Sequence, residues 1–266
     1  MRNLALPGEV QRYRFFPPLL GRIERQRAAT PCAIDQDVDM AEPQARGVAQ
    51  CACGVRRHGL VALGERSAVK ILEPPSDAQT LVQRAAFQLL LARGGAIGLN
   101  DLAQHSGVRL DSVSNLVDLL DGAGRIRRNA AGEVVGSGGL SVIPDRHEIE
   151  LDGRRFWTWC AYDILGIFGV SGATGQAVSP SPPDGRPIVL RFTRGRPDKH
   201  GAVLFRPDEN LMTSCENVYE QWCPNSNLFG SRELAEQWAD QQGLPGRVLD
   251  LDEASDLATK AWRDVV

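Results

Sequence analysis

The chain changes character at Pro74-Pro75-Ser76-Asp77. Before this point Pro, Gly, Arg and Gln are scattered, and no apolar periodicity holds for more than a turn or two. Because a core needs a repeating apolar face, residues 1–75 are predicted to form a poorly ordered extension. After this point apolar residues recur at helical spacing, and Ser76 or Asp77 is a suitable cap for the helix. The recurring residues are Leu81, Val82, Ala85, Ala86, Leu89 and Leu90.

Residues 76–143 are predicted to form a winged-helix-like module. Two more helices are expected over 100–105 and 110–120, and a hairpin over 125–136. Such a module invites a DNA-binding interpretation. However, the third helix carries Asp111, Asp118 and Asp121, and no Lys or Arg lies between positions 110 and 124. Acidic side chains there would repel phosphates, so a packing role is favoured.

Residues 144–266 are predicted to form a second, mixed-sheet domain, which makes the fold class α+β. Strands are expected over 147–151, 188–192, 202–205 and 247–251, and helices over 161–168, 232–242 and 253–263. The helix over 232–242 has Ser231 as its cap and Gly243 as its stop, and Leu234, Ala235 and Trp238 are expected to face inward. The turn-rich segment 179–187 is expected to be a mobile loop.

Composition limits the classes of function. The net charge of −3 gives no general attraction for nucleic acid or acidic membranes. No apolar stretch approaches the roughly 18 residues of a membrane span, so a cytoplasmic protein is expected. Six cysteines in 266 residues are too sparse for a disulfide framework. No CxxC pair occurs, which argues against structural zinc.

The segment Phe156-Trp157-Thr158-Trp159-Cys160-Ala161-Tyr162-Asp163 and the later Trp222-Cys223-Pro224 carry the candidate chemistry. On a helix Cys160 and Asp163 share one face. A soft metal would deprotonate such thiols, and the aspartate, whose ordinary pKa is about 3.9, could take up the released proton. The alternatives are a buried cysteine that acts as a small hydrophobe, and an aspartate that accepts from a backbone N–H or from Arg154 or Arg155.

From about residue 79 to the C-terminus the chain resembles the organomercurial lyases, also called alkylmercury lyases. The motifs that carry the resemblance are Gly132-Glu133-Val134-Val135-Gly136, residues 148–155, Trp159-Cys160-Ala161-Tyr162-Asp163, Trp222-Cys223 and residues 235–239. The resemblance implies a helical module followed by a mixed-sheet catalytic domain, with Cys160, Asp163 and Cys223 as the residues that bind mercury and cleave its bond to carbon. It implies no organic cofactor. The implied partners are organomercurials, small thiols and a mercuric reductase.

The chain also departs from that family. Ser181, Pro224 and Asn227 stand where many members have two further cysteines and a histidine. Residues 1–75, with Cys51 and Cys53, have no recognised counterpart, and Met40 is an alternative start. The rival interpretation is a winged-helix protein that senses a soft metal through the same thiols without turnover.

Overall fold

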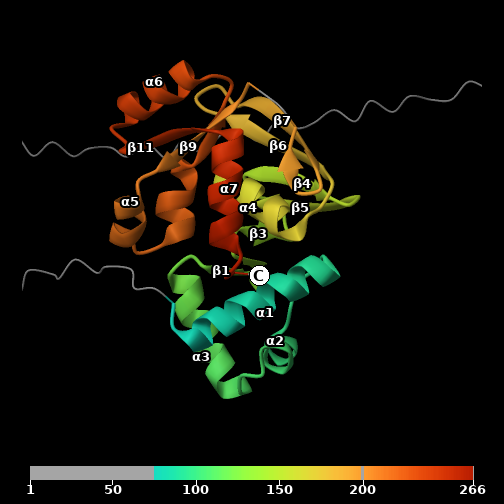
Figure 1. Cartoon of the computed structure of the whole chain (residues 1–266). Helices are drawn as coiled ribbons and strands as arrows, with labels where there is room; N and C mark the ends of the chain where they lie inside the picture. The colour runs from blue at the N-terminus through green and yellow to red at the C-terminus, as the bar shows by residue number, and fades with distance from the viewer. Residues whose placement is uncertain (1–74, 199–200, 266) are drawn as a thin grey trace, which may run out of the picture. The chain divides into compact units, whose positions relative to one another are not determined.

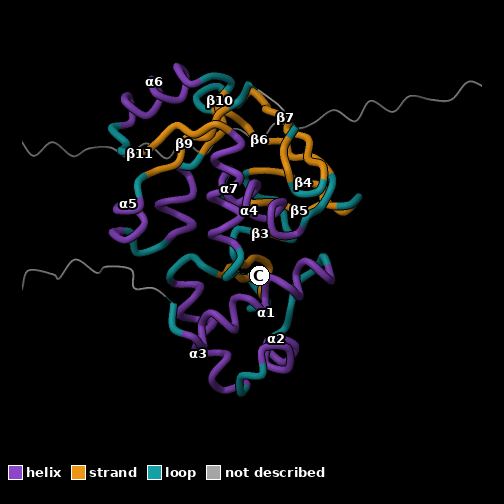
Figure 2. The backbone as a smooth tube through the Cα atoms, in the orientation of Figure 1, coloured by secondary structure: helices purple, strands orange, loops and turns teal. Residues whose placement is uncertain are grey.

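The computed structural model describes residues 75–198 and 201–265 (Figures 1 and 2). They form an α+β fold with an eight-stranded sheet in the order β1-β2-β3-β5-β4-β6-β7-β8 and a three-stranded sheet in the order β10-β9-β11, both antiparallel. The predicted extension, apart from Pro75, lies outside the described residues, as do Met40, Cys51 and Cys53.

Three helices come first: α1 (Asp77–Arg93), α2 (Leu99–Ser106) and α3 (Leu110–Gly122). Ser76 begins α1 with a capping box, in which its Oγ accepts from the Gln79 N–H and the Gln79 Oε1 accepts from the Ser76 N–H at 2.7 Å. The three helices pack against one another, as Figure 1 shows. The predicted positions of all three are confirmed.

A ribbon of short strands follows: β1 (Ile126–Arg128), β2 (Val134–Ser137) and β3 (Leu140–Ser141). β1 and β2 pair antiparallel, which confirms the predicted hairpin. β3 pairs with both β2 and β5, so the ribbon continues directly into the main sheet. Gly138 and Gly139, both with positive φ, make the tight turn between β2 and β3.

The rest of the large sheet consists of β4 (His147–Leu151), β5 (Arg154–Thr158), β6 (Gly175–Ser181), β7 (Arg186–Thr193) and β8 (Arg196–Pro197). The prediction of a mobile loop over 179–187 was wrong. β6 and β7 stay paired as far as Ser181 and Arg186, and only the residues between them form a turn. The prolines in this segment hid the strand pairing from sequence patterns.

The second sheet contains β9 (Val203–Pro207), β10 (Asn227–Phe229) and β11 (Gly246–Asp250). Its connections hold α5 (Glu209–Ser214), a π-helical turn η1 (Val218–Trp222), a 3₁₀ turn η2 (Cys223–Asn225) and α6 (Arg232–Gln242). Ser231 and Gly243 bound α6 as predicted. The predicted inward orientation is confirmed for Ala235, which is buried, and for Trp238, which packs against the same core cluster. It was wrong for Leu234, which is 54% exposed.

The helix α4 (Ala161–Ser171) lies at the centre of the core and packs on α7 (Leu251–Trp262). Two glycines of α4 allow this close approach. A Cβ on Gly166 would come within 2.4 Å of the Trp262 ring, and one on Gly169 within 1.9 Å of Thr259 Oγ1. α4 is buried almost throughout, so the residues at its N-terminus are fixed inside the protein. In the part of the chain described, no helix is long and apolar enough to span a membrane.

Candidate active site

Cys160 lies where β5 passes into α4, as the residue that caps this helix. Its extended backbone (φ −144°, ψ 169°) directs its N–H toward the first turn, where it donates to Asp163 Oδ2 at 2.7 Å. The aspartate therefore reaches back to the helix cap as the acidic residue of a capping box does. The same hydrogen bond fixes the carboxylate beside the thiol.

Cys223 arrives from a distant part of the sequence, at the junction of η1 and η2. Backbone hydrogen bonds hold this segment in place. The Val218 N–H donates to the Ala123 carbonyl at 3.0 Å, and the Ala161 N–H donates to the Ser226 carbonyl at 3.1 Å. The second bond ties the first residue of α4 directly to the loop that follows Cys223.

The structure brings the three predicted site residues together. One ligand atom each from Cys160, Asp163 and Cys223 lies within 4.8 Å of the other two. All three side chains are buried, with exposed fractions of 0%, 4% and 2%. Two sulfurs and one carboxylate oxygen in this arrangement suit a soft metal with a proton carrier beside it.

Burial controls the protonation of the three groups. It raises the pKa of Asp163 to about 7, although hydrogen bonds from Cys160 oppose the rise. Burial raises the pKa of the Cys160 thiol well above its ordinary value, and the hydrogen bond with Cys223 and the charge of Asp163 add to this effect. For Cys223 the hydrogen bond with Cys160 lowers the pKa, but burial and the charge of Asp163 leave it raised. Both thiols are therefore protonated before a metal arrives.

Arg146 joins the two segments that carry the cysteines. Its guanidinium donates to the Trp159 carbonyl at 2.9 Å and to the Tyr219 carbonyl at 3.2 Å. It also lies over the Tyr219 ring, 4.4 Å from the centroid. Its charge lowers the pKa of Asp163, which partly offsets burial. Sequence patterns gave no indication of this role, since the contacts join residues far apart in the chain.

The Gly138-Gly139 turn closes over Asp163. A Cβ on Gly139, whose φ is +86°, would lie 2.4 Å from Asp163 Cγ. The Trp262 indole donates to the Gly138 carbonyl at 2.9 Å, so the end of α7 supports the same turn. This turn was not predicted from the sequence, although a pair of adjacent glycines between two short strands is a recognisable signal of a tight turn.

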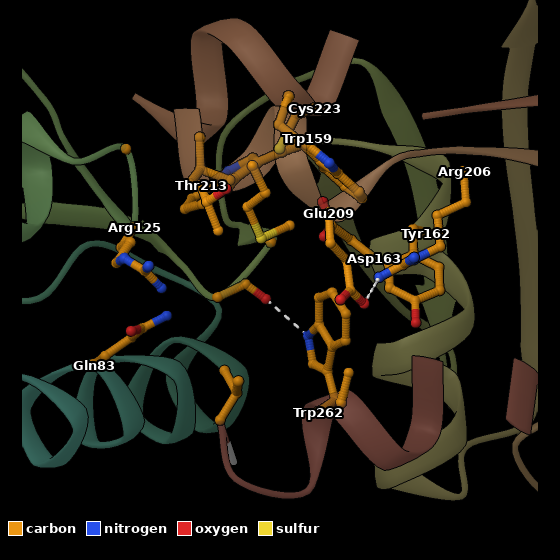
Figure 3. A pocket seen from close by; sticks show the side chains of 18 residues that line it. Gln83, Arg125, Trp159, Tyr162, Asp163, Arg206, Glu209, Thr213, Cys223 and Trp262 are labelled. Carbon is orange, nitrogen blue, oxygen red and sulfur yellow. Dashed lines mark hydrogen bonds and ion pairs between the residues drawn. The ribbon is translucent and has the colours of Figure 1, made fainter. Parts of the chain in front are cut away.

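A cavity of about 360 Å³ opens onto the site (Figure 3). Asp163 and Cys223 line it, whereas Cys160 is not part of its wall and is fully buried. Of the aromatic residues near Cys160 in the sequence, Trp159 and Tyr162 form part of the cavity wall. Phe168 instead stacks on Phe192 and Trp157 lies on β5, both outside the lining. The remaining apolar side chains in the wall are Met212, Val218, Trp222, Ala261, Trp262 and Val265.

Of the alternative partners expected for Asp163, a backbone N–H is present, that of Cys160, whereas the two arginines are occupied elsewhere. Arg154 donates to the Leu91 carbonyl at 2.7 Å, and Arg155 pairs with Glu148 at 3.2 Å. Two of the three positions that depart from the family pattern follow Cys223 closely. Asn227 Nδ2 donates to the Pro224 carbonyl at 2.9 Å, so this pair shapes the loop that follows Cys223.

The family model described as alkylmercury lyase (MerB) matches residues 140–263. An alkylmercury lyase from Staphylococcus epidermidis is 28% identical over 173 residues, which cover 63% of this chain and 76% of that protein. One from Pseudomonas putida is 28% identical over 177 residues, which cover 62% of this chain and 75% of that protein. Over residues 140–263 the chain is therefore similar to alkylmercury lyases.

A crystal structure of the mercury-bound form of MerB2 has a similar fold. Its TM-score with this chain is 0.63 at 23% identity, and the match covers 73% of this chain and 94% of that one. At this identity the likeness establishes the common fold. The segments that carry Cys160, Asp163 and Cys223 all lie within the residues that the alkylmercury lyase family model matches.

Proposed function

We propose that this protein cleaves the carbon–mercury bond of organomercurials by protonolysis, with Cys160, Cys223 and Asp163 as its catalytic residues. The observation that carries this assignment of roles is the grouping of two thiols and one carboxylate within 4.8 Å beside an apolar cavity. The similarity to alkylmercury lyases over residues 140–263 supports the reaction class.

The reaction balances with these groups alone. Cys223 and Cys160 bind R–Hg⁺ and each gives up a proton, because a coordinating thiol is deprotonated. One proton leaves to solvent and the other passes to Asp163. The electron pair of the carbon–mercury bond stays with carbon, which takes the proton from Asp163 and leaves as RH. Hg(II) remains bound to the two sulfurs until other thiols remove it.

A carboxyl with a pKa of about 7 suits this task. It accepts and returns a proton near neutral pH, which an ordinary aspartate, with a pKa of about 3.9, does poorly. From the sequence alone, Asp163 was expected to be ionised at neutral pH and to take up the proton that a metal-bound thiol releases. Burial relaxes the requirement for that proton.

The finer assignments follow from the same arrangement. We propose that residues 76–143 form a winged-helix-like module with a packing role and residues 144–266 the catalytic domain. The charges on the ribbon support packing, since Arg128 pairs with Asp118 at 2.7 Å and Asp121 at 3.0 Å, and Arg127 with Asp145 at 2.8 Å. We further propose that the protein acts in the cytoplasm without an organic cofactor and passes Hg(II) to small thiols or to a mercuric reductase.

Asp163→Asn tests the proposed reaction. The amide keeps the shape of the carboxylate but does not carry a proton at neutral pH. With phenylmercury and excess thiol, the unmutated protein should release benzene, whereas the variant should retain a phenylmercury adduct that mass spectrometry detects.

The rival, a sensor without turnover, predicts the adduct in both proteins and benzene from neither. Equal benzene release from both proteins would remove Asp163 from the mechanism. Near-neutral titration of a buried carboxyl has no evident use in a sensor, so the lyase is the better interpretation.

A further inference from the structure

Two polar side chains in the cavity wall have no evident task in the cleavage reaction. They are Arg125, which precedes β1, and Gln83, on the inner face of α1. Within residues 75–198 and 201–265, neither the guanidinium nor the side-chain amide has a hydrogen-bond or ion-pair partner. The other charged or hydroxyl groups of the wall beside Asp163 have partners: Arg206 pairs with Glu209 at 2.8 Å, Thr213 Oγ1 donates to the Asn210 carbonyl at 3.1 Å, and Tyr162 interacts with Arg206.

The two side chains lie together on the part of the wall formed by the helical module. Figure 3 shows the Arg125 guanidinium and the Gln83 amide pointing toward each other, with Asp163 and Trp262 farther across the cavity. Gln83 is 9% exposed, so its amide is confined to this place. Together the Arg125 guanidinium and the Gln83 amide present several N–H donors to the same part of the cavity.

The backbone around Arg125 is linked to both parts of the catalytic site. Gly124 lies so close to η1 that a Cβ there would come within 2.1 Å of Asn217 Oδ1. The Arg125 carbonyl accepts from the Gly138 N–H at 3.3 Å, beside the turn that covers Asp163. The backbone that carries the Arg125 side chain is therefore held by the segments that place Cys223 and Asp163.

The chemistry of the pair favours an anion. A half-buried guanidinium without an acceptor has lost hydration that nothing replaces, and burial accordingly lowers the pKa of Arg125. A planar carboxylate would accept from the guanidinium in a bidentate manner and from the amide as well. The apolar residues between this pair and Cys223 would contact an aromatic or aliphatic body, as in other small-molecule sites.

We propose that Arg125 and Gln83 form a carboxylate-binding subsite, which selects mercury compounds that carry a carboxylate. The inference rests on the proposed function. The carboxylate belongs either to the organic group or to a thiol that the mercury brings with it. The bound anion would hold the compound with its mercury near Cys223.

Paired substrates test the subsite and separate the two sources. The first pair is 4-carboxyphenylmercury and phenylmercury, both with 2-mercaptoethanol. The second is phenylmercury with 3-mercaptopropionate or with 2-mercaptoethanol. In each pair the ratio of kcat/KM with and without the carboxylate is compared. Two separate variants, Arg125→Met and Gln83→Leu, should each lower the preference for the carboxylate-bearing compound by about tenfold to a hundredfold. The loss should appear in KM, and its size is the usual cost of a lost charge-assisted hydrogen bond.

Matched variants separate recognition from loss of structure. Arg125→Lys should keep part of the selectivity, because it keeps the charge but not the bidentate geometry. Gln83→Glu should lower the ratio as well, since the new carboxylate competes for Arg125, and it serves as the test if Arg125→Met does not fold. Arg109→Met, on an 86%-exposed side chain, should keep the ratio of the unmutated protein.

If the variants lower the ratio in the first pair, the recognised carboxylate belongs to the organic group. If they lower it in the second pair, the carboxylate belongs to the thiol. Ratios that stay unchanged in both pairs overturn the proposal. Calorimetric titration measures the binding of benzoate directly, with benzyl alcohol as the uncharged control ligand. This measurement does not depend on turnover. If no organomercurial is cleaved, benzoate binding that depends on Arg125 supports the subsite while the proposed function fails, and absence of such binding overturns the subsite too.

Discussion

At the scale of single residues, Asp163 shows how much burial alone contributes. The carboxyl lies beside two thiols under a glycine turn, and its burial there raises its pKa to about 7 although hydrogen bonds from Cys160 oppose the rise. Its ordinary value would leave on the order of 0.1% protonated at pH 7. The fold therefore converts a common side chain into a proton carrier that works near neutral pH.

The raised pKa of Asp163 has a consequence for stability that can be measured. Because the carboxyl binds its proton more tightly in the folded protein, it stabilises the fold fully only below pH 4, and this contribution is lost as pH rises through about 7. The stability of the unmutated protein relative to Asp163→Asn should fall by roughly 2–3 kcal/mol between pH 5 and 8. Urea unfolding under reducing conditions measures it, and a flat difference would contradict the raised pKa.

The two thiols should be equally indispensable. Cys160→Ser or Cys223→Ser should abolish benzene release from phenylmercury, because a hydroxyl is a far poorer ligand for a soft metal than a thiolate. Cys215→Ser is the matched control and should retain most activity, since this thiol donates to the Met212 carbonyl and is not part of the cavity wall. Near-normal turnover in either of the first two variants excludes the two-thiol mechanism.

At the scale of elements, the clearest sequence signals marked helix ends. Ser76, Ser231 and Gly243 bound their helices as predicted, because capping is a local interaction. The pairing of β6 with β7 was missed, since prolines obscure a strand pattern and pairing depends on residues far away. Leu234 was misplaced because a helical stripe does not specify which edge of it meets the core.

The Gly138-Gly139 turn, which connects β2 to β3 and covers Asp163, can be tested by substitution. Gly139→Ala should lower turnover strongly, because the new methyl would overlap the carboxyl group in addition to straining the backbone. Gly132→Ala separates these effects, since Gly132 also has a positive φ (+80°) but a Cβ there meets nothing within 4 Å. This control should lose about 1 kcal/mol of stability and little activity. Thermal melts and kcat values of both variants decide, and equal activities would mean that the turn does not control Asp163.

At the scale of the whole molecule, the parts of the site that lie close together in the sequence were predictable, and the parts that come from distant segments were not. Cys160 and Asp163 lie three residues apart, so helical geometry alone placed them on one face. Cys223 was linked to them only through a family resemblance. The contacts of Arg146 and Gly139 arise when the ribbon, α4 and η1 come together, and no spacing in the sequence encodes that.

The extension provides a test on the same scale. Deletion of residues 1–75 should preserve folding and turnover, because this segment lacks the apolar periodicity that a core needs. Ser76, which caps α1, is kept in the shortened chain. Circular dichroism and benzene release check the result, and loss of either would show that the segment belongs to the fold.

The raised pKa values of Cys160 and Cys223 also bear on how the enzyme survives between encounters with its substrate. Peroxides and alkylating agents attack the thiolate, and attack requires access to the sulfur. Two protonated, buried thiols are poor targets for both. Mercury needs no prior deprotonation, because its binding expels the proton. The resting enzyme should therefore resist iodoacetamide and hydrogen peroxide while it stays reactive toward mercurials, and burial provides the discrimination.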